Sequence, residues 1–366
     1  MRTRLTVALL TALALAACSG GGGNSSVPNQ NSNGNSQTTQ SLTTQESAQT
    51  GSEAALSSVE QGDEENGLYN GNMGITLAGM YRTTQSAPDG TCHNGVEKTV
   101  TVISPTEKKY DVKYFYDKAC TQLAREVVSD VVNNGSGEII TRVATNYNHS
   151  ALLISTRRTN FSITGTLGSG NFTETAIGSL TIGTSSTPAT QHGRSFTVST
   201  ASGSNVSTIT GNSGHVVNNG NPKVDESFGH SAILSNVTKT TDSSGNITFA
   251  GGRNGTFYKG ALGSLTLSSA PPFTISGGTQ IGTGSVNGTV DFDNDGELTA
   301  INVTAALLDG DTVALSGSGD PITINGTVKD SGGNVLATVV LDGYGDGIIT
   351  YANGTQGVVT DWHIVA

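Results

Sequence analysis

Two alternating runs, Val96-Glu-Lys-Thr-Val-Thr-Val-Ile103 and Tyr110-Asp-Val-Lys-Tyr-Phe-Tyr116, flank the short segment Ser104-Pro-Thr-Glu-Lys108. Apolar and polar residues alternate with a period of two, which is typical of strands that bury one face. A turn centred on Thr106 pairs residues whose numbers sum to 212, and places the valines and tyrosines on one face and most charged residues and threonines on the other. The stretch therefore predicts an antiparallel β-hairpin.

The same kind of pattern continues from about Gly74 to the end of the chain, as short Val, Ile, Thr and Leu runs separated by Gly, Asn, Asp and Pro. Of the 366 residues, 49 are Gly and only 13% are charged, so Ser, Thr, Asn and Gly provide most of the polarity. Such residues are typical of turns and strand surfaces. The predicted fold class is all-β, with an antiparallel meander over residues 74–366 that forms a sandwich, an open barrel or a long twisted sheet.

Two segments of this region resemble each other. Gly170–Ile182 and Gly255–Leu267 are identical at seven of thirteen positions. This similarity predicts duplicated β units over residues 161–366, preceded by a subdomain of disulfide-clipped hairpins over residues 74–160. Convergence of one strand pattern in a biased composition is the alternative.

The first eighteen residues carry a resemblance to a known class. Arg2 and Arg4 precede an apolar run, and Leu15-Ala16-Ala17-Cys18 closes it. This arrangement resembles the signal peptide and lipobox of bacterial lipoproteins. The resemblance implies that residues 1–17 are removed and that Cys18 becomes a lipidated N-terminus, which anchors the protein to the membrane of the cell envelope. Ser19 favours the outer membrane, on either its periplasmic or its surface-facing side; an ordinary secretory signal is the alternative.

The residues between the lipobox and the β region divide into two parts. Residues 18–50 consist largely of Gly, Ser, Asn, Gln and Thr, a composition that predicts a flexible tether. Residues 51–73 are expected to form a short helix or an irregular linker. Helical character is present over Glu53–Glu60, and Gly62-Asp-Glu-Glu-Asn-Gly67 is expected to end it.

Assignment of Cys18 to lipid leaves Cys92 and Cys120 as a pair. Their numbers also sum to 212, so the hairpin register predicts that they lie opposite each other and form a disulfide in an oxidising compartment. A metal site or a catalytic thiol is the alternative, but no cluster of His and Cys lies near them in the sequence.

One acidic motif resembles a metal-binding loop. Asp291-Phe-Asp293-Asn-Asp295-Gly296 matches the first half of a calcium loop, although an EF-hand requires Glu where this chain has Asn302. The motif indicates either a plain β-turn or a structural calcium site formed by the three Asp side chains. No other cofactor is expected.

Charge and missing motifs exclude several function classes. Loss of residues 1–17 removes Arg2 and Arg4 and changes the formal net charge from −11 to −13, which disfavours nucleic acid as a partner. The chain contains neither Gly-x-Ser-x-Gly nor His-Glu-x-x-His, and its six histidines show no close ligand spacing. We therefore expect a protein that is not an enzyme.

A lipobox followed by a Gly-rich segment and Gly-x-Phe hairpins is similar to surface lipoproteins of the transferrin-binding type. That family's Phe-Tyr-Gly-Pro element is absent, because Lys259-Gly260 follows Phe257-Tyr258, and no ligand residues are carried over. The expected function is binding, adhesion or envelope structure, with a protein or glycan as ligand. The alternative is an extracytoplasmic enzyme, such as a carbohydrate-active protein, with a dispersed carboxylate site; two inward carboxylates in a groove favour it.

Overall fold

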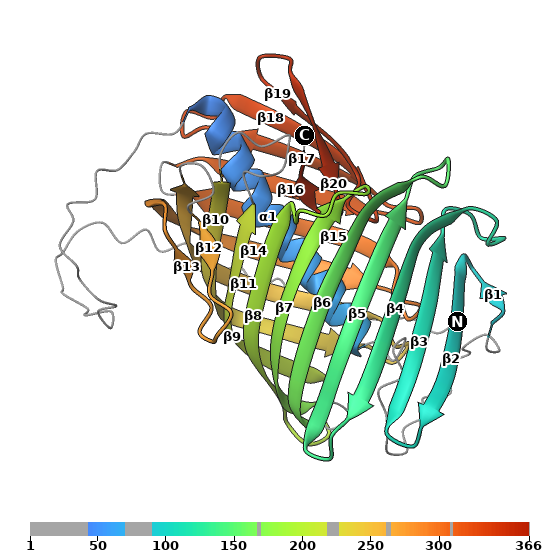
Figure 1. The fold of residues 1–366 in the computed structure, drawn as a ribbon. Helices are drawn as coiled ribbons and strands as arrows, with labels where there is room; N and C mark the ends of the chain where they lie inside the picture. The colour runs from blue at the N-terminus through green and yellow to red at the C-terminus, as the bar shows by residue number, and fades with distance from the viewer. Residues whose placement is uncertain are drawn as a thin grey trace, which may run out of the picture. The chain divides into compact units, whose positions relative to one another are not determined.

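The computed structural model of the protein describes residues 43–69, 90–166, 170–217, 227–260, 265–307 and 310–365. In these residues the chain forms one helix, a 19-stranded antiparallel sheet and a separate two-stranded sheet (Figure 1). The predicted all-β meander is therefore confirmed. The expected signal peptide, Cys18 and residues 18–42 of the tether lie outside the described residues. No helix in the described part is long and apolar enough to span a bilayer.

Each strand of the large sheet pairs with the next strand along the chain, except that β11 pairs with β14 across the small sheet. The helix is α1 (Thr44–Tyr69). The strands are β1 (Cys92–His93), β2 (Val96–Ser104), β3 (Glu107–Phe115), β4 (Leu123–Asn133), β5 (Gly137–Tyr147), β6 (Leu153–Thr166), β7 (Asn171–Ile182), β8 (Thr190–Thr200), β9 (Val206–Val217), β10 (Ser227–Thr241), β11 (Ile247–Gly260), β12 (Thr266–Leu267), β13 (Ile275–Ser276), β14 (Thr279–Phe292), β15 (Leu298–Leu307), β16 (Thr312–Ser318), β17 (Thr323–Lys329), β18 (Val335–Asp342), β19 (Gly347–Tyr351), β20 (Gln356–Thr360) and β21 (His363–Ile364).

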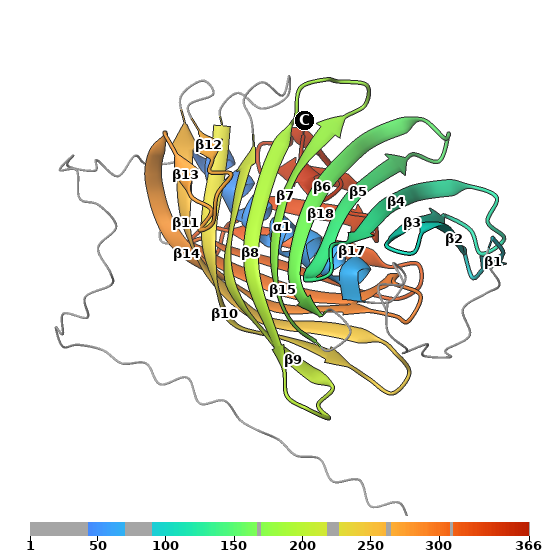
Figure 2. The same ribbon diagram turned by 60° about the horizontal axis from the view of Figure 1, so that its bottom comes forward.

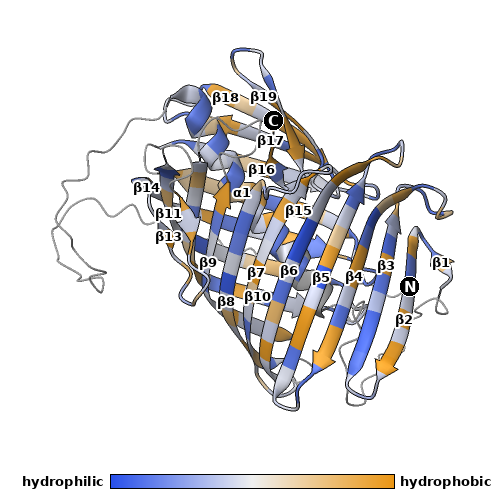
Figure 3. Ribbon diagram, viewed as in Figure 1, coloured by the Kyte–Doolittle hydropathy of each residue, from blue (hydrophilic) through white to orange (hydrophobic). Residues whose placement is uncertain are grey.

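The large sheet curves around α1, which lies on its concave side (Figures 1 and 2). In most strands of the large sheet, alternate residues are buried. In β16, for example, Val313 and Leu315 are buried, whereas Thr312, Ala314 and Ser316 are exposed. Figure 3 shows the same alternation as polar and apolar bands along the strands. The hydrophobic core therefore lies between the sheet and the helix, and the Thr and Ser side chains coat the convex face.

Helix α1 begins with a capping box and is longer than the sequence predicts. The Thr43 N–H donates to Glu46 Oε2 at 2.7 Å, and Thr43 Oγ1 accepts the Glu46 N–H at 3.3 Å. The helix then continues through Gly62-Asp-Glu-Glu-Asn-Gly67, where a break is expected. Gly62 packs on Val290 and Phe292 of the sheet, and this tertiary packing outweighs the roughly 1 kcal/mol helix penalty of each glycine.

The predicted hairpin is present with a different register. Val96 pairs with Tyr114 and Val100 with Tyr110, so the residue numbers sum to 210, and the predicted sum of 212 is wrong. A slip of two residues keeps the same alternation, and Tyr110 and Val112 are buried as predicted, whereas Val102, predicted on the same face, is 65% exposed. The disulfide between Cys92 and Cys120 is confirmed, with a Cα–Cα distance of 6.0 Å. It joins β1 to the loop after β3 and does not follow from the register.

The sheet runs without interruption across the boundary expected at residue 160, because β6 pairs with both β5 and β7. The two similar segments also differ in structure. Gly170–Ile182 includes the whole of β7, whereas the second segment leaves the sheet after Gly260 and reaches the small sheet at Thr266. Phe172 and Phe257 are both buried, which is what the two segments share.

Candidate functional site

Four hairpins contain the same five-residue turn, with Asp first and Gly fourth. The Asp N–H donates to the carbonyl of the fifth residue and the Gly N–H donates to the Asp carbonyl, at 2.9–3.2 Å. The fourth residue has φ between +80° and +93°, which favours glycine. The Asp Oδ1 atom accepts the N–H of the fifth residue at 2.8–3.0 Å. The four turns are Asp242–Asn246, Asp293–Glu297, Asp330–Asn334 and Asp342–Asp346.

The fifth residue separates these turns into two pairs. In the two exposed turns it is Asn246 or Asn334, and its Nδ2 donates to Oδ2 of the first Asp at 2.9 and 2.8 Å. The hydrogen bond from Asn334 lowers the pKa of Asp330. In the two partly buried turns the fifth residue is Glu297 or Asp346. A carboxylate there faces another carboxylate in place of an amide donor.

The two partly buried turns consequently contain destabilised carboxylates. Burial and repulsion from Asp293 raise the pKa of Glu297 to about 7. Burial and repulsion from Asp342 raise the pKa of Asp346 to about 7, although Asp346 Oδ1 accepts the Asp361 N–H at 2.9 Å. Both acids are therefore more readily protonated than ordinary carboxyl groups.

The two turns lie at one cavity of about 330 Å³. The turn between β16 and β17 and the end of β3 complete its wall. Its lining is rich in carboxylates and in aromatic rings. The carboxylates are Asp117, Asp293, Glu297, Asp320 and Asp342, and the rings include Tyr114, Phe115, Tyr116, Phe292, Tyr344 and Trp362. Arg125 and Arg142 also line the cavity, and the Arg142 guanidinium donates to the Glu64 carbonyl of α1 at 3.1 Å.

Two tyrosines form the aromatic centre of the cavity wall. The rings of Tyr116 and Tyr344 are 5.8 Å apart and nearly perpendicular, and Tyr116 also stacks on His149 at 3.9 Å. The Tyr116 hydroxyl donates to the Tyr147 carbonyl at 2.7 Å, and burial raises the pKa of both tyrosines. These phenols thus stay protonated at neutral pH, and their rings are the groups that they offer to a ligand.

The disulfide fixes one wall of the cavity. The loop that contains Cys120 is organised by Asp117, whose carboxylate accepts the N–H groups of three following residues. Lys118 in the same loop forms a 2.8 Å ion pair with Asp320 on the facing turn. Because Cys92 links this loop to β1, the bond restrains the residues that close the cavity.

The structure places the three residues of the expected calcium site in different surroundings. Asp293 caps its own turn and lines the cavity. Asp291 accepts a 2.6 Å hydrogen bond from Thr248, and Asp295 lies 3.6 Å from His93. Calcium binding by this set stays a prediction. Among the described residues, the His, Cys, Asp and Glu groups with ligand atoms within 4.8 Å of one another are Glu53–His215–His363 and Glu60–Glu64–His192.

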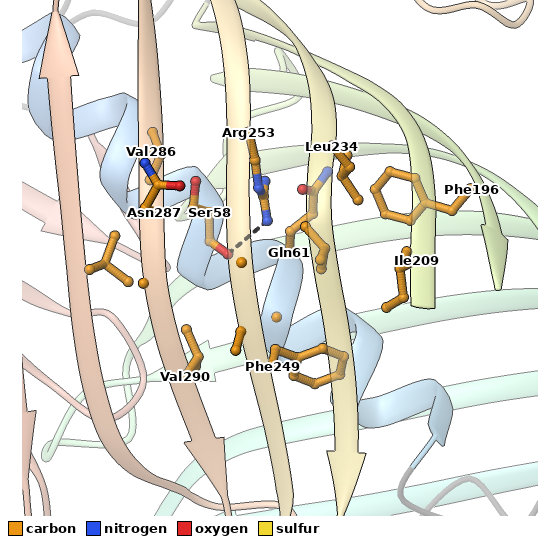
Figure 4. A pocket seen from close by; sticks show the side chains of 16 residues that line it. Ser58, Gln61, Phe196, Ile209, Leu234, Phe249, Arg253, Val286, Asn287 and Val290 are labelled. Atoms are coloured by element: carbon orange, nitrogen blue, oxygen red, sulfur yellow. Dashed lines mark hydrogen bonds between the residues drawn. The ribbon is translucent and has the colours of Figure 1, made fainter. Parts of the chain in front are cut away.

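A second cavity lies between α1 and the sheet but is much smaller. Its volume is about 60 Å³, and Phe196, Ile209 and Leu234 contribute to a mostly apolar lining (Figure 4). Arg253 crosses it and donates to the Ser58 carbonyl at 3.2 Å. This space suits packing and a few water molecules, so the 330 Å³ cavity is the candidate site.

Sequence reasoning did not identify Glu297. It follows a glycine in a hairpin turn, a position that is normally treated as the start of the next strand. The sequence holds one sign of it: two other turns of this kind have Asn246 and Asn334 at the equivalent position, where this turn has an acid.

Comparisons with protein-family models, with curated proteins and with solved structures found no match.

Proposed function

We propose that the protein is a non-catalytic binding protein of the bacterial cell envelope, anchored through lipidated Cys18, whose cavity binds a small organic cation. The observation that carries this proposal is Glu297, the acid at the fifth position of a turn that lines the cavity. The exposed turns form the same backbone hydrogen bonds with Asn246 and Asn334. The carboxylate of Glu297 is therefore not required by the turn, which points to a role toward a ligand.

A cation in the cavity would remove the electrostatic penalty of Glu297. Its pKa is about 7 because burial and the neighbouring Asp293 disfavour its charged form. A bound ammonium or guanidinium group would supply the opposite charge at short range. The rings of Tyr116 and Tyr344 offer cation–π contacts, which contribute about 0.5–2 kcal/mol each.

The spread of the acids favours an extended organic cation over a metal ion. In the described part of the chain, no three cavity acids bring ligand atoms within 4.8 Å of one another. Calcium requires six to eight oxygens at about 2.3–2.6 Å from one point. A cavity of about 330 Å³ instead accommodates a molecule that spans both turns.

A second candidate function is glycoside hydrolysis, because Glu297 combines a raised pKa with a cavity that contains aromatic rings. That chemistry requires two carboxyl groups with separate roles. Asp293 and Asp342 each use Oδ1 to accept backbone N–H groups, and Asp320 pairs with Lys118. Glu297 is thus the cavity carboxyl least committed to structural hydrogen bonds, which supports binding over hydrolysis.

Calorimetric titration of the purified protein tests the proposal. The probes are butylammonium, 1,4-diaminobutane, guanidinium, a neutral monosaccharide and calcium chloride. We expect binding of the diamine or guanidinium at pH 8, with affinity at least tenfold weaker in Glu297→Gln, since one charge-assisted contact is lost. Asn334→Asp provides the matched control, because it adds the same acid to an exposed turn and is expected to leave binding unchanged.

The other outcomes are equally informative. Sugar binding that Glu297→Gln leaves intact, with no binding of the organic cations, would overturn the proposal in favour of a glycan ligand. Calcium binding that disappears in Asp293→Asn, again without binding of the organic cations, would overturn the proposal and show that the cavity binds a metal ion. Hydrolysis of a chromogenic glycoside that is lost in Glu297→Gln would support the enzyme.

A further inference from the structure

A separate cluster of charged groups lies on the concave side of the sheet. Helix α1 contributes Glu53, β9 contributes His215 and β21 contributes His363, and all three are buried. Glu53 Oε2 lies 3.3 Å from His363 Nδ1 and 3.6 Å from His215 Nε2. Three side chains from distant parts of the sequence thus bring potential metal-ligand atoms within 4.8 Å of one another.

His215 is the most informative member of this cluster. It is only 3% exposed, and neither of its ring nitrogens has a hydrogen-bond partner. Its 3.6 Å contact with Glu53 is longer than a hydrogen bond. An imidazole that is buried with one long ion-pair contact and no hydrogen bond costs stability, which a further ligand would offset.

The distances suit a transition metal. Zinc binds His nitrogen and carboxylate oxygen at about 2.0–2.2 Å in a tetrahedral arrangement, which places neighbouring ligand atoms roughly 3.3–3.6 Å apart. The two measured separations, 3.3 and 3.6 Å, fall in this range. The rings of His215 and His363 stack in parallel, with centroids 4.6 Å apart, so one ring must turn for both nitrogens to point at the same ion.

The surrounding contacts provide the outer shell that metal ligands normally have. His363 Nε2, the nitrogen away from Glu53, lies 3.2 Å from Glu60 Oε2. The second oxygen of Glu53 accepts the Ile364 N–H at 2.5 Å. A carboxylate behind a histidine and a backbone donor on a ligating carboxylate orient such ligands and fix the histidine tautomer.

The neighbouring set of Glu60, Glu64 and His192 is a weaker candidate because guanidinium groups already neutralise it. Arg157 lies 3.4 Å from Glu60 and 3.7 Å from Glu64, and Arg194 forms an ion pair with Glu64. The ion pairs of Glu53 in the described chain involve histidines alone.

We propose that Glu53, His215 and His363 bind one divalent transition metal of the zinc class. The ion would join α1 to β9 and β21 and act as a structural clamp on the concave side of the sheet. This inference does not depend on the organic-cation proposal, because the two sites share no residue.

Metal titration of the full chain tests the clamp. Protein stripped with a chelator is titrated with zinc and, separately, with cobalt, and the melting temperature and the visible absorption of cobalt are recorded. We expect one equivalent to bind, a rise in melting temperature, and the intense visible bands of four-coordinate cobalt. His215→Gln is expected to weaken zinc binding at least 100-fold.

His230→Gln is the matched control. His230 is the cross-strand neighbour of His215 on β10 and is equally buried, but its Nε2 lies 3.2 Å from Ser57 Oγ and it is not one of the three ligands. We expect the control to retain one zinc. Absence of the cobalt bands in the wild-type chain, which requires no variant to fold, overturns the proposal, as does equal zinc affinity of wild type and His215→Gln.

Discussion

Replacement of Asp346 by Asn should stabilise the protein, and the gain should grow with pH. The change converts the buried turn Asp342–Asp346 into the form of the exposed turns, in which the fifth residue donates to the first Asp. Asn can still accept the Asp361 N–H through its carbonyl oxygen. The variant therefore removes a carboxylate without removing the backbone hydrogen bonds of the turn.

The pKa of Asp346 determines the magnitude and the sign of the change in unfolding free energy with pH. In the folded protein the pKa is about 7, against an ordinary value of 3.8 for an Asp side chain. The folded state consequently binds more protons between these two pH values, and the wild type loses stability as pH rises from about 4 to 7. This loss amounts to roughly 2 kcal/mol at pH 5 and about 4 kcal/mol at pH 8. Asn does not titrate, so the advantage of the variant should follow the same curve.

Urea unfolding of both proteins at pH 5 and pH 8 measures this difference. Other titrating groups are common to both chains, so their contributions largely cancel in the comparison. Asn334→Asp in the exposed turn is the reverse control and should cost no more than about 1 kcal/mol, because only a solvent-exposed hydrogen bond is lost. An advantage of Asp346→Asn that is equal at the two pH values, or absent at pH 8, refutes the electrostatic explanation.

Three further outcomes are expected. Replacement of Cys92 and Cys120 by Ala should lower the free energy of unfolding by about 3–4 kcal/mol, as measured with urea, because the cross-link restrains the unfolded chain; unchanged stability would contradict this. Gly345→Ala should destabilise far more than Gly333→Ala: both have φ near +80°, but an added Cβ meets the Trp362 ring at 2.4 Å at position 345 and no atom within 4 Å at position 333. We expect about 1–2 kcal/mol for Gly333→Ala and a further 1–3 kcal/mol for Gly345→Ala, and equal melting temperatures would argue against the contact with Trp362. Cys18→Ala should abolish lipidation and membrane retention in cell fractionation, whereas an acylated, membrane-bound variant would rule out the lipobox.

The fold class could be predicted because period-two alternation and frequent turn residues are local properties of the sequence. The register was not equally determined, since sums of 212 and 210 place the same residues of the first hairpin on the same faces. The extent of α1 depends on packing against the sheet, so its continuation through Gly62 has no local signal. Local patterns therefore predicted the elements, and long-range packing decided their limits.

The candidate sites were harder to predict for related reasons. His215 on β9 lies opposite His192 on β8 and His230 on β10, although these partners are 23 and 15 positions away in the sequence. Such spacing depends on strand and loop lengths, so it matches no compact metal motif. Glu297 belongs to a turn that the sequence pattern predicted, but the cavity that it lines forms only when several hairpin ends meet.

The arrangement of α1 has a consequence for the order in which the protein can be built. Glu53 leaves the ribosome early, but its partner His363 follows 310 positions later. Until β21 has been synthesised, the Glu53 carboxylate lacks its His363 partner, and the contacts between α1 and β21 cannot form. A polypeptide that stops before residue 361 also lacks the carboxylate that binds Arg157. Prematurely terminated chains should thus not hold α1 against the sheet and should be cleaved readily by proteases. The buried ion pairs therefore make the stable fold depend on the last residues to be synthesised.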